Sequence, residues 1–149
     1  MVIVPMKPEY YPQLVELWSS FPGNAITGAD SPEGFLRFLG ANGKYCFAAL
    51  SNGALAGSVM AGHDNRRGYV YHLAVREDLQ GAGIGRSLMQ SCEKALYDSG
   101  IEKIHLFIYS DNPAVEFYRK AGWHLRGDIE VMSKVLHGDS LTGTRIEED

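Results

Sequence analysis

The amino-acid sequence predicts an α/β fold in which a mixed β-sheet carries helices on its faces. The predicted elements follow the order β, α, α, β, β, β, α, β, α, β, β, and the strand–helix–strand unit over residues 69–109 is typical of a parallel strand pair. The three strands predicted over 45–75 are joined by short turns, so we expect them to be antiparallel. The 149 residues suffice for one domain, expected over 1–136, with a polar tail over 137–149.

A short strand at residues 2–4 precedes two amphipathic helices. The first helix begins between Pro8 and Pro12, and its apolar positions recur at helical spacing at Leu14, Leu17, Trp18 and Phe21. The second helix begins after Ser31, because a capping hydroxyl there precedes a proline in the first turn. Its apolar face consists of Phe35, Leu36, Phe38 and Leu39. Residues 22–30 are expected to form a loop.

The three antiparallel strands occupy residues 45–50, 55–62 and 69–75. The first two flank Ser51-Asn52-Gly53, and an Asn-Gly pair readily adopts the positive φ that a hairpin turn requires. A second turn over 64–68 leads into the third strand.

The second half of the chain begins with a helix of about 16 residues that ends at Gly100. Its apolar positions are Ile84, Leu88, Cys92, Ala95 and Leu96. Over residues 103–109, both faces of a strand would carry apolar side chains. This pattern predicts a strand covered on both sides. A short helix over 113–120 should end at Gly122, and two strands at 123–125 and 130–136 should close the sheet.

Composition and charge argue against several classes of function. The composition, with 45% hydrophobic and 21% charged residues, is that of a globular protein. The sequence has no apolar run long enough to cross a bilayer and no secretion signal. We therefore expect a cytoplasmic protein without a membrane partner. A net charge of −4 with scattered basic residues argues against nucleic acid as a partner. Cys46 and Cys92 form no C-x-x-C pair, and His63-Asp64 has no suitably spaced third ligand, so we expect reduced thiols and no metal.

The segment between the strand at 69–75 and the long helix carries the strongest functional signal. It reads Gln80-Gly81-Ala82-Gly83-Ile84-Gly85-Arg86-Ser87. Alternating glycines let the backbone approach a ligand, and their amides together with the first-turn donors of the helix suit a pyrophosphate. Arg86 adds a positive charge. A dinucleotide motif would need glycine at that position, and a nucleoside-triphosphate loop would need Gly-Lys-Ser/Thr, so neither fits.

Two motifs at the proper separation resemble those of the GNAT superfamily of acyl-CoA-dependent N-acyltransferases. Leu73-Ala74-Val75 followed by Gln80-x-x-Gly83-x-Gly85 is similar to its acetyl-CoA signature, Q/R-x-x-G-x-G/A after a strand. Residues 112–123, Asn-Pro-Ala-Val-Glu-Phe-Tyr-Arg-Lys-Ala-Gly-Trp, resemble its later segment, N…A-x-x-F/L-Y-x-x-x-G-F/W. The span 57–123 looks most like small stand-alone bacterial members. The resemblance implies antiparallel N-terminal strands, a central parallel pair that splays apart, and flanking helices.

The resemblance also implies acetyl-CoA as co-substrate and assigns residues to it. Backbone groups of Leu73 and Val75 would meet the pantetheine arm and the thioester, Gln80 to Arg86 would hold the pyrophosphate, and the Tyr118 hydroxyl would face the coenzyme sulfur. The full expected set is Leu73, Ala74, Val75, Gln80, Gly81, Ala82, Gly83, Ile84, Gly85, Arg86, Ser87, Asn112 and Tyr118. Tyr118 lies six residues after Asn112, whereas seven is commoner in the family, so either Asp111 or Asn112 fills the place of the family asparagine.

The general base is less clear from the sequence. A lysine-like amine, with a pKa near 10.4, must lose a proton before it attacks. Where some family members carry a glutamate on the preceding strand, this chain has Leu106 and Phe107. The candidates are Tyr71 and His72, with His63-Asp64 nearby, and a histidine ordinarily titrates in the useful range. Structural roles remain open for His72 and Tyr118, and core packing accounts for most aromatic residues of the two early helices, which in the family cover the acceptor cleft.

From these observations we expect an enzyme that transfers the acetyl group of acetyl-CoA directly to a primary amine of a small molecule or peptide. No covalent enzyme intermediate is expected, because neither cysteine lies in either motif. One alternative is an acyl-CoA-binding sensor without turnover, which the missing strand glutamate motivates; another is an acetyltransferase specific for one protein partner. An exposed edge strand near the C-terminus would permit a homodimer.

Overall fold

A five-stranded mixed sheet forms the centre of the computed structural model, which describes residues 1–21 and 26–138. Its strands, in spatial as well as chain order, are β1 (Val2–Pro5), β2 (Phe47–Ser51), β3 (Ala54–His63), β4 (Gly68–Val75) and β5 (Ile104–Leu106). The first four strands pair antiparallel, and β4 pairs with β5 in parallel. The predicted antiparallel strands and the central parallel pair are therefore confirmed.

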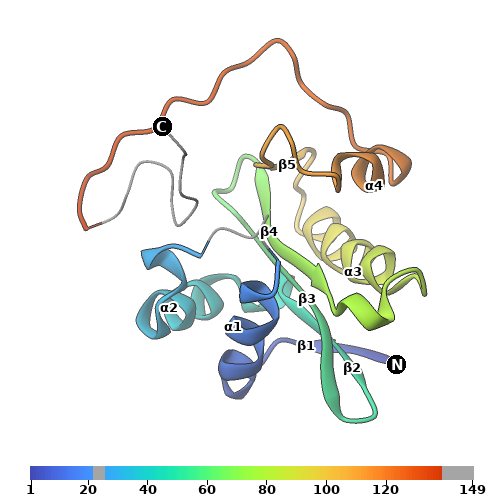
Figure 1. Cartoon of the computed structure of the whole chain (residues 1–149). Helices are drawn as coiled ribbons and strands as arrows, with labels where there is room; N and C mark the ends of the chain where they lie inside the picture. The colour runs from blue at the N-terminus through green and yellow to red at the C-terminus, as the bar shows by residue number, and fades with distance from the viewer. Residues whose placement is uncertain (22–25, 139–149) are drawn as a thin grey trace.

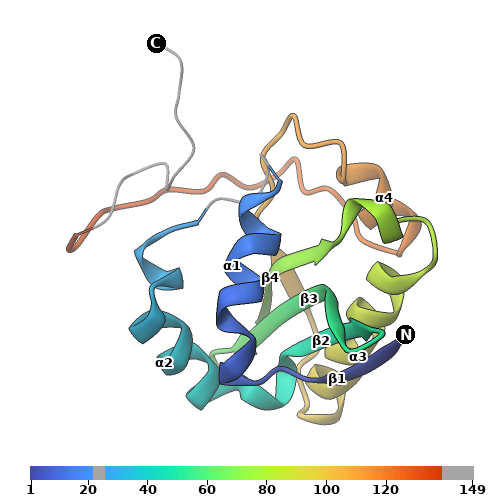
Figure 2. The same ribbon diagram turned by 60° about the horizontal axis from the view of Figure 1, so that its bottom comes forward.

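Helices cover both faces of this sheet (Figures 1 and 2). They are α1 (Tyr11–Ser19), α2 (Pro32–Asn42), α3 (Ile84–Asp98) and α4 (Val115–Lys120), with short 3-10 helices at Pro8–Tyr10, Gly28–Asp30, Gly43–Tyr45 and Glu77–Leu79. One face packs on α1 and α2 and the other on α3, and each interface has its own buried apolar cluster. None of the helices in the described ranges has both the length and the apolar composition needed to cross a bilayer.

Local signals in the sequence account for most element boundaries. Ser31 caps α2 by accepting a hydrogen bond from the Gly34 amide at 3.1 Å, and a proline follows it in the first turn. Asn52 and Gly53 adopt φ values of 51° and 78°, as the predicted hairpin turn requires. Gly100, with φ of 87°, follows α3 where a left-handed residue was expected.

The C-terminal part of the sheet differs from the prediction. β5 contains only Ile104–Leu106, and Phe107 is 64% exposed, so the expected strand over 103–109 is shorter and is not covered on both sides. The predicted strands at 123–125 and 130–136 are absent from described residues 123–138. Apolar alternation forms a strand only where backbone partners and a covering layer exist.

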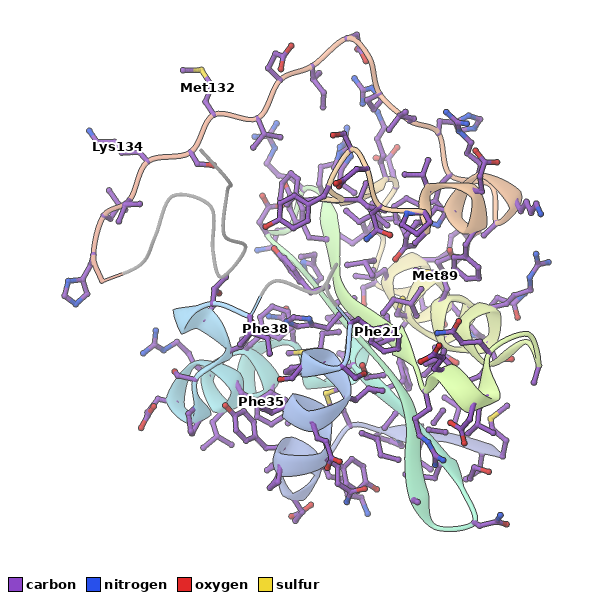
Figure 3. The ribbon with its side chains drawn as sticks, in the orientation of Figure 1. Phe21, Phe35, Phe38, Met89, Met132 and Lys134 are labelled. Carbon is purple, nitrogen blue, oxygen red and sulfur yellow. The ribbon has the colours of Figure 1, made fainter. Side chains whose placement is uncertain are left out.

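The segment after α4 instead runs away from the sheet. Met132 and Lys134 project from it into solvent in Figure 3, and Met132 is 96% exposed. β5 therefore remains an edge strand within the described part of the chain. Of the predicted tail, residues 139–149 lie outside the described residues.

Candidate functional site

A β-bulge in β4 organises the candidate site. Met60 pairs with Tyr71 and Ser58 pairs with Ala74, so two residues of β4 oppose the single residue between Ser58 and Met60 on β3. His72 is one of the two, and its φ of 50° lies in the left-handed region.

The extra residue changes which face of the sheet each side chain joins. Val70, Leu73 and Val75 pack in the cluster beneath α3, the apolar cluster between α3 and the sheet that includes Val59, Leu88, Cys92 and Leu96. Tyr71 contacts Phe38 of α2, and His72 contacts Trp18 of α1. The two adjacent side chains, at 71 and 72, therefore point to the same face, which regular alternation along a strand would not allow.

His72 is held by an acidic residue that the sequence analysis did not single out. Its Nε2 lies 2.9 Å from Asp30 Oδ1, and the side chains of His72 and Asp30 are only 9% and 12% exposed. Asp30 lies in a segment predicted only as a loop. A capping-box pattern from Thr27 to Asp30 could have indicated an ordered turn there. The pairing itself spans 42 residues of sequence and depends on tertiary structure.

The backbone of His72 is fixed by a buried hydrogen-bond relay. Trp18 Nε1 donates to Ser58 Oγ at 2.9 Å, and Ser58 Oγ donates to the His72 carbonyl oxygen at 2.7 Å. Ser58 and Trp18 are fully buried. The predicted core role of Trp18 is confirmed, and the relay stabilises the left-handed backbone at the bulge.

Tyr71 forms part of a more open aromatic surface on the same face. Its side chain is 42% exposed and meets the ring of Phe38 edge-on, with centroids 5.8 Å apart. Figure 3 shows Phe38 and Phe35 on α2 and Phe21 at the end of α1, on this side of the sheet. Burial, followed by the charge of Tyr69, raises the pKa of Tyr71, so at neutral pH its hydroxyl is a hydrogen-bonding group and a poor base.

The glycine-rich loop follows β4 after the short 3-10 helix Glu77–Leu79. Gly81 and Gly83 adopt φ values of 86° and 84°, a region that residues with side chains rarely enter. The first backbone hydrogen bond at the start of α3 runs from the Ser87 amide to the Gly83 carbonyl. The amides of residues 84–86 are therefore not used by the helix and point outward from its positive end.

Close packing explains the third glycine of the loop. A Cβ on Gly85 would lie 3.4 Å from the Phe117 ring of α4 and 3.6 Å from Val75, at the short end of ordinary contact. The Gln80 side chain closes the loop from the other side, because its Nε2 donates to the Val75 carbonyl oxygen at 3.1 Å. The loop thus fits a phosphate-bearing ligand through backbone donors and space, with the exposed Arg86 as a flanking cation.

β4 has an open backbone edge next to this loop. Pairing with β5 ends at Val70 and Leu106, although β4 continues to Val75. The Arg76 amide donates to Ala56 of β3, and backbone groups alternate in direction along a strand, so those of Leu73 and Val75 face away from β3. The parallel pairing ends because β5 ends at Leu106, so β5 leaves the C-terminal half of this edge of β4 uncovered.

Tyr118 lies on the other side of the sheet from His72. It packs against the cluster beneath α3 and meets Trp123 edge-on, with centroids 5.8 Å apart. Burial, and to a smaller extent nearby Cys92, raises the pKa of Tyr118 to about 12. The hydroxyl is therefore protonated at neutral pH and can donate a hydrogen bond.

Asn112 has a structural task at the turn before α4. Its Oδ1 accepts a hydrogen bond from the Ala114 amide at 2.9 Å. The side-chain carbonyl is therefore committed to the turn, while the amide group keeps its donors. This turn lies at the start of the segment in which Tyr118 follows Asn112 after six residues, one fewer than is common in the family.

The other candidate groups have structural partners. His63 Nε2 lies 3.0 Å from the Tyr45 hydroxyl, and its Nδ1 accepts the Asn65 amide. Asp64 accepts the amides of Arg66 and Arg67, which accounts for the turn expected there. Within residues 1–21 and 26–138, no three His, Cys, Asp or Glu side chains gather as metal ligands.

Comparison with known protein sequences relates the chain to acetyltransferases. The sequence model of the acetyltransferase (GNAT) family matches residues 11–123. An acetyltransferase of Pectobacterium atrosepticum is 47% identical over 64 residues, covering 43% of this chain and 45% of that protein. An acetyltransferase of Sodalis glossinidius is 36% identical over 88 residues, covering 58% and 62%. The chain thus matches less than two thirds of the length of either relative.

Solved structures share the fold over most of the chain. An aminoglycoside acetyltransferase from an uncultured soil metagenomic sample has a TM-score of 0.70 at 21% identity, covering 91% of this chain and 96% of its own. A Mycobacterium tuberculosis protein solved in complex with CoA has a TM-score of 0.71 at 14% identity, covering 89% and 77%. At these identities the likeness concerns the fold, and the fold predicted from the sequence is confirmed.

Proposed function

Because the chain belongs to the GNAT family of acetyltransferases, we propose that it transfers the acetyl group of acetyl-CoA directly to a primary amine of a small molecule or peptide. One observation carries the proposal: β4 continues beyond its pairing with β5, and after the short 3-10 helix Glu77–Leu79 the chain enters a loop with two left-handed glycines and the first-turn amides of α3. Acetyl-CoA has the matching parts, an extended pantetheine arm and a pyrophosphate. The residues from Gln80 to Ser87 would hold the pyrophosphate, and Leu73 to Val75 would hold the arm.

Bound acetyl-CoA supplies a thioester whose carbonyl carbon an amine can attack, with the coenzyme thiol as leaving group. In our proposal His72 accepts the proton that the amine loses, directly or through water. Tyr71, beside it on the same face, orients the acceptor through its exposed hydroxyl and ring. A backbone amide of β4 at the open edge stabilises the charge that develops on the carbonyl oxygen.

Tyr118 would act on the leaving group by hydrogen bonding. Its pKa of about 12 lies well above the value of about 8.5 for an ordinary thiol, so full proton transfer to the thiolate is uphill. A hydrogen bond from a neutral phenol still stabilises a departing thiolate. Tyr118 and His72 lie on opposite faces of the sheet. In our proposal they therefore approach a pantetheine arm at the edge of β4 from opposite sides.

The two cysteines support direct transfer. Cys46 and Cys92 are fully buried, and burial raises their pKa values to about 11 and about 12. A buried thiol that remains protonated is a poor nucleophile. Neither cysteine is therefore suited to carry the acetyl group between donor and acceptor.

The test combines cofactor binding with a screen of acceptors. Calorimetry should detect acetyl-CoA binding, and thiol release should be measured with polyamines, aminoglycosides, amino acids and N-terminal peptides. His72→Gln should reduce thiol release while leaving acetyl-CoA affinity unchanged. His124→Gln removes an exposed histidine and serves as the matched control.

Each other outcome has a definite meaning. Tight binding without thiol release on any amine would favour an acyl-CoA sensor. Release only with one polypeptide would favour a protein-specific acetyltransferase. Absence of any heat with CoA or acetyl-CoA would overturn the proposal.

A further inference from the structure

We propose that Asp30 is a positioning residue for His72, which it holds in the tautomer whose Nδ1 accepts the proton of the acceptor amine. This inference rests on the proposed function, because it takes His72 as the base. It adds a residue from the loop between α1 and α2, a part of the chain that contains no recognised motif. The two side chains meet at 2.9 Å through His72 Nε2 and Asp30 Oδ1.

The chemistry of the contact determines the tautomer. An ionised carboxylate only accepts hydrogen bonds, so Nε2 of His72 must carry the proton that is donated to Asp30. A neutral imidazole has one protonated and one unprotonated nitrogen. Nδ1 is therefore the basic nitrogen of the ring, and the amine proton can only be accepted there.

The ring of His72 is constrained in two further ways. The indole of Trp18 stacks on it, with centroids 4.1 Å apart and an angle of 15° between planes. The carbonyl of His72 is held by Ser58 Oγ. Stacking fixes the plane of the ring but leaves its two edges interchangeable, and Asp30 removes that ambiguity.

Asp30 is itself anchored by other groups. Its Oδ2 accepts the Thr27 amide at 3.1 Å, while the Thr27 hydroxyl accepts the Ala29 amide at 3.2 Å. The Tyr11 hydroxyl donates to the Asp30 carbonyl oxygen at 2.6 Å. The carboxylate therefore divides its two oxygens between the turn and the histidine, and the turn holds it from the side away from His72.

The pair is also electrostatically suited to proton uptake. Both side chains are nearly buried, so water screens their interaction much less than at the surface. When His72 accepts a proton, the resulting imidazolium lies against a carboxylate at hydrogen-bond distance. The contact is then a hydrogen bond between two charged groups, which is shorter than one between neutral groups.

The experiment separates ring orientation from activity. Long-range proton–nitrogen NMR spectra of labelled protein report which nitrogen of His72 is protonated, with His72→Gln used to assign the signals. The kinetic parameters kcat and KM are measured for Asp30→Ala and Asp30→Asn on an amine found in the acceptor screen. Asp64→Asn is the matched control, because the Asp64 carboxylate, like that of Asp30, accepts backbone amides of a turn but lies beyond the opposite end of β4.

We expect Nε2 to be protonated in the wild-type protein and Asp30→Ala to give a mixture of tautomers. The kcat of this variant should fall about 10- to 100-fold with the KM for acetyl-CoA unchanged. Asp30→Asn has one carbonyl oxygen where Asp30 uses two, so His72 Nε2 and the Thr27 amide compete for it; this variant should give a partial mixture of tautomers and lose less activity than Asp30→Ala. Asp64→Asn should leave both readouts unchanged.

Two results would overturn the inference: a wild-type ring protonated at Nδ1, or an unchanged kcat in Asp30→Ala with the thermal unfolding midpoint preserved. If Asp30→Ala fails to fold, Asp30→Asn decides: a folded Asp30→Asn protein with the tautomer and kcat of the wild type would overturn the inference, because its one oxygen cannot serve both His72 and the Thr27 amide. If the wild-type protein binds acetyl-CoA but acetylates no amine, the proposed function fails together with the base role of His72. The tautomer would still show whether Asp30 orients the ring.

Discussion

Trp18 and His72 stack almost face to face, with ring centroids 4.1 Å apart. Trp18 belongs to α1, whereas His72 lies in the bulge of β4, so the contact joins a covering helix to the central strand. The same indole also donates to Ser58, which in turn donates to the His72 carbonyl oxygen. Ring and backbone of the proposed base are therefore positioned by one buried side chain.

Ser58→Ala should lower the free energy of unfolding by about 2 to 4 kcal/mol, because it leaves two buried groups unpaired. These groups are the indole N–H of Trp18 and the carbonyl oxygen of His72. Urea unfolding measures the change. The double variant Ser58→Ala/Trp18→Phe should cost at least about 1 kcal/mol less than the sum of the single variants, because the unpaired indole is gone. Strict additivity would mean that the relay is not energetically coupled.

Gly83→Glu should weaken acetyl-CoA binding at least about 10-fold, because a carboxylate beside the loop amides repels the pyrophosphate and competes for its donors. Calorimetry measures the dissociation constant. Gly100→Glu is the matched control, since Gly100 has a similar φ of 87° but lies at the far end of α3. Both variants should lose stability from backbone strain, and only the first should lose affinity. If Gly83→Glu and Gly100→Glu bind acetyl-CoA with equal affinity, the result would argue against a phosphate site in this loop.

The parts of the fold that the sequence predicted correctly depend on single residues or on residues adjacent in the sequence. The Asn52-Gly53 turn, the Ser31 cap and the left-handed Gly100 each follow from the conformations that one or two residues prefer. The ligand class predicted for the glycine loop rests in the same way on backbone amides, and it stays a prediction.

The features that the sequence could not predict depend on contacts between distant segments. Nothing in the pattern around His72 marks a bulge, because Tyr-His-Leu-Ala-Val is compatible with an unbroken strand. The position of Asp30 against His72 depends on how the loop after α1 packs on the sheet. Apolar alternation over 130–136 predicted a strand. Alternation alone does not determine whether such a segment pairs with the edge strand β5.

Tyr118→Phe should reduce kcat about 10- to 100-fold, the effect of losing one hydrogen bond to a charged leaving group. Acetyl-CoA affinity should stay unchanged, because the ring still fills its place beside Trp123. Since the pKa of Tyr118 is about 12, its titration should cause no fall in wild-type kcat between about pH 7 and 10. Tyr97→Phe, at a 78% exposed position, is the control. An unchanged kcat in Tyr118→Phe would leave the residue a core role only.

The two buried thiols should make the protein less stable in alkali. Their pKa values of about 11 and about 12 exceed the ordinary value of 9.0, so the unfolded chain loses these protons first as pH rises. Their contribution is fully present below about pH 9 and is lost as pH rises toward 11 to 12, on the order of 3 kcal/mol per thiol. Urea unfolding between pH 8 and 11 measures the slope.

Cys92→Ala separates this effect from general alkaline denaturation. The variant should be less stable than wild type at pH 8, because it leaves a cavity next to Leu88 and Met89 in the cluster beneath α3. Its stability should then fall less steeply above pH 9, since one of the two titrating thiols is gone. Tyr118 remains as a further buried group that titrates in alkali. Parallel pH curves for variant and wild type would mean that Cys92 ionises as readily in the folded protein as in the unfolded chain.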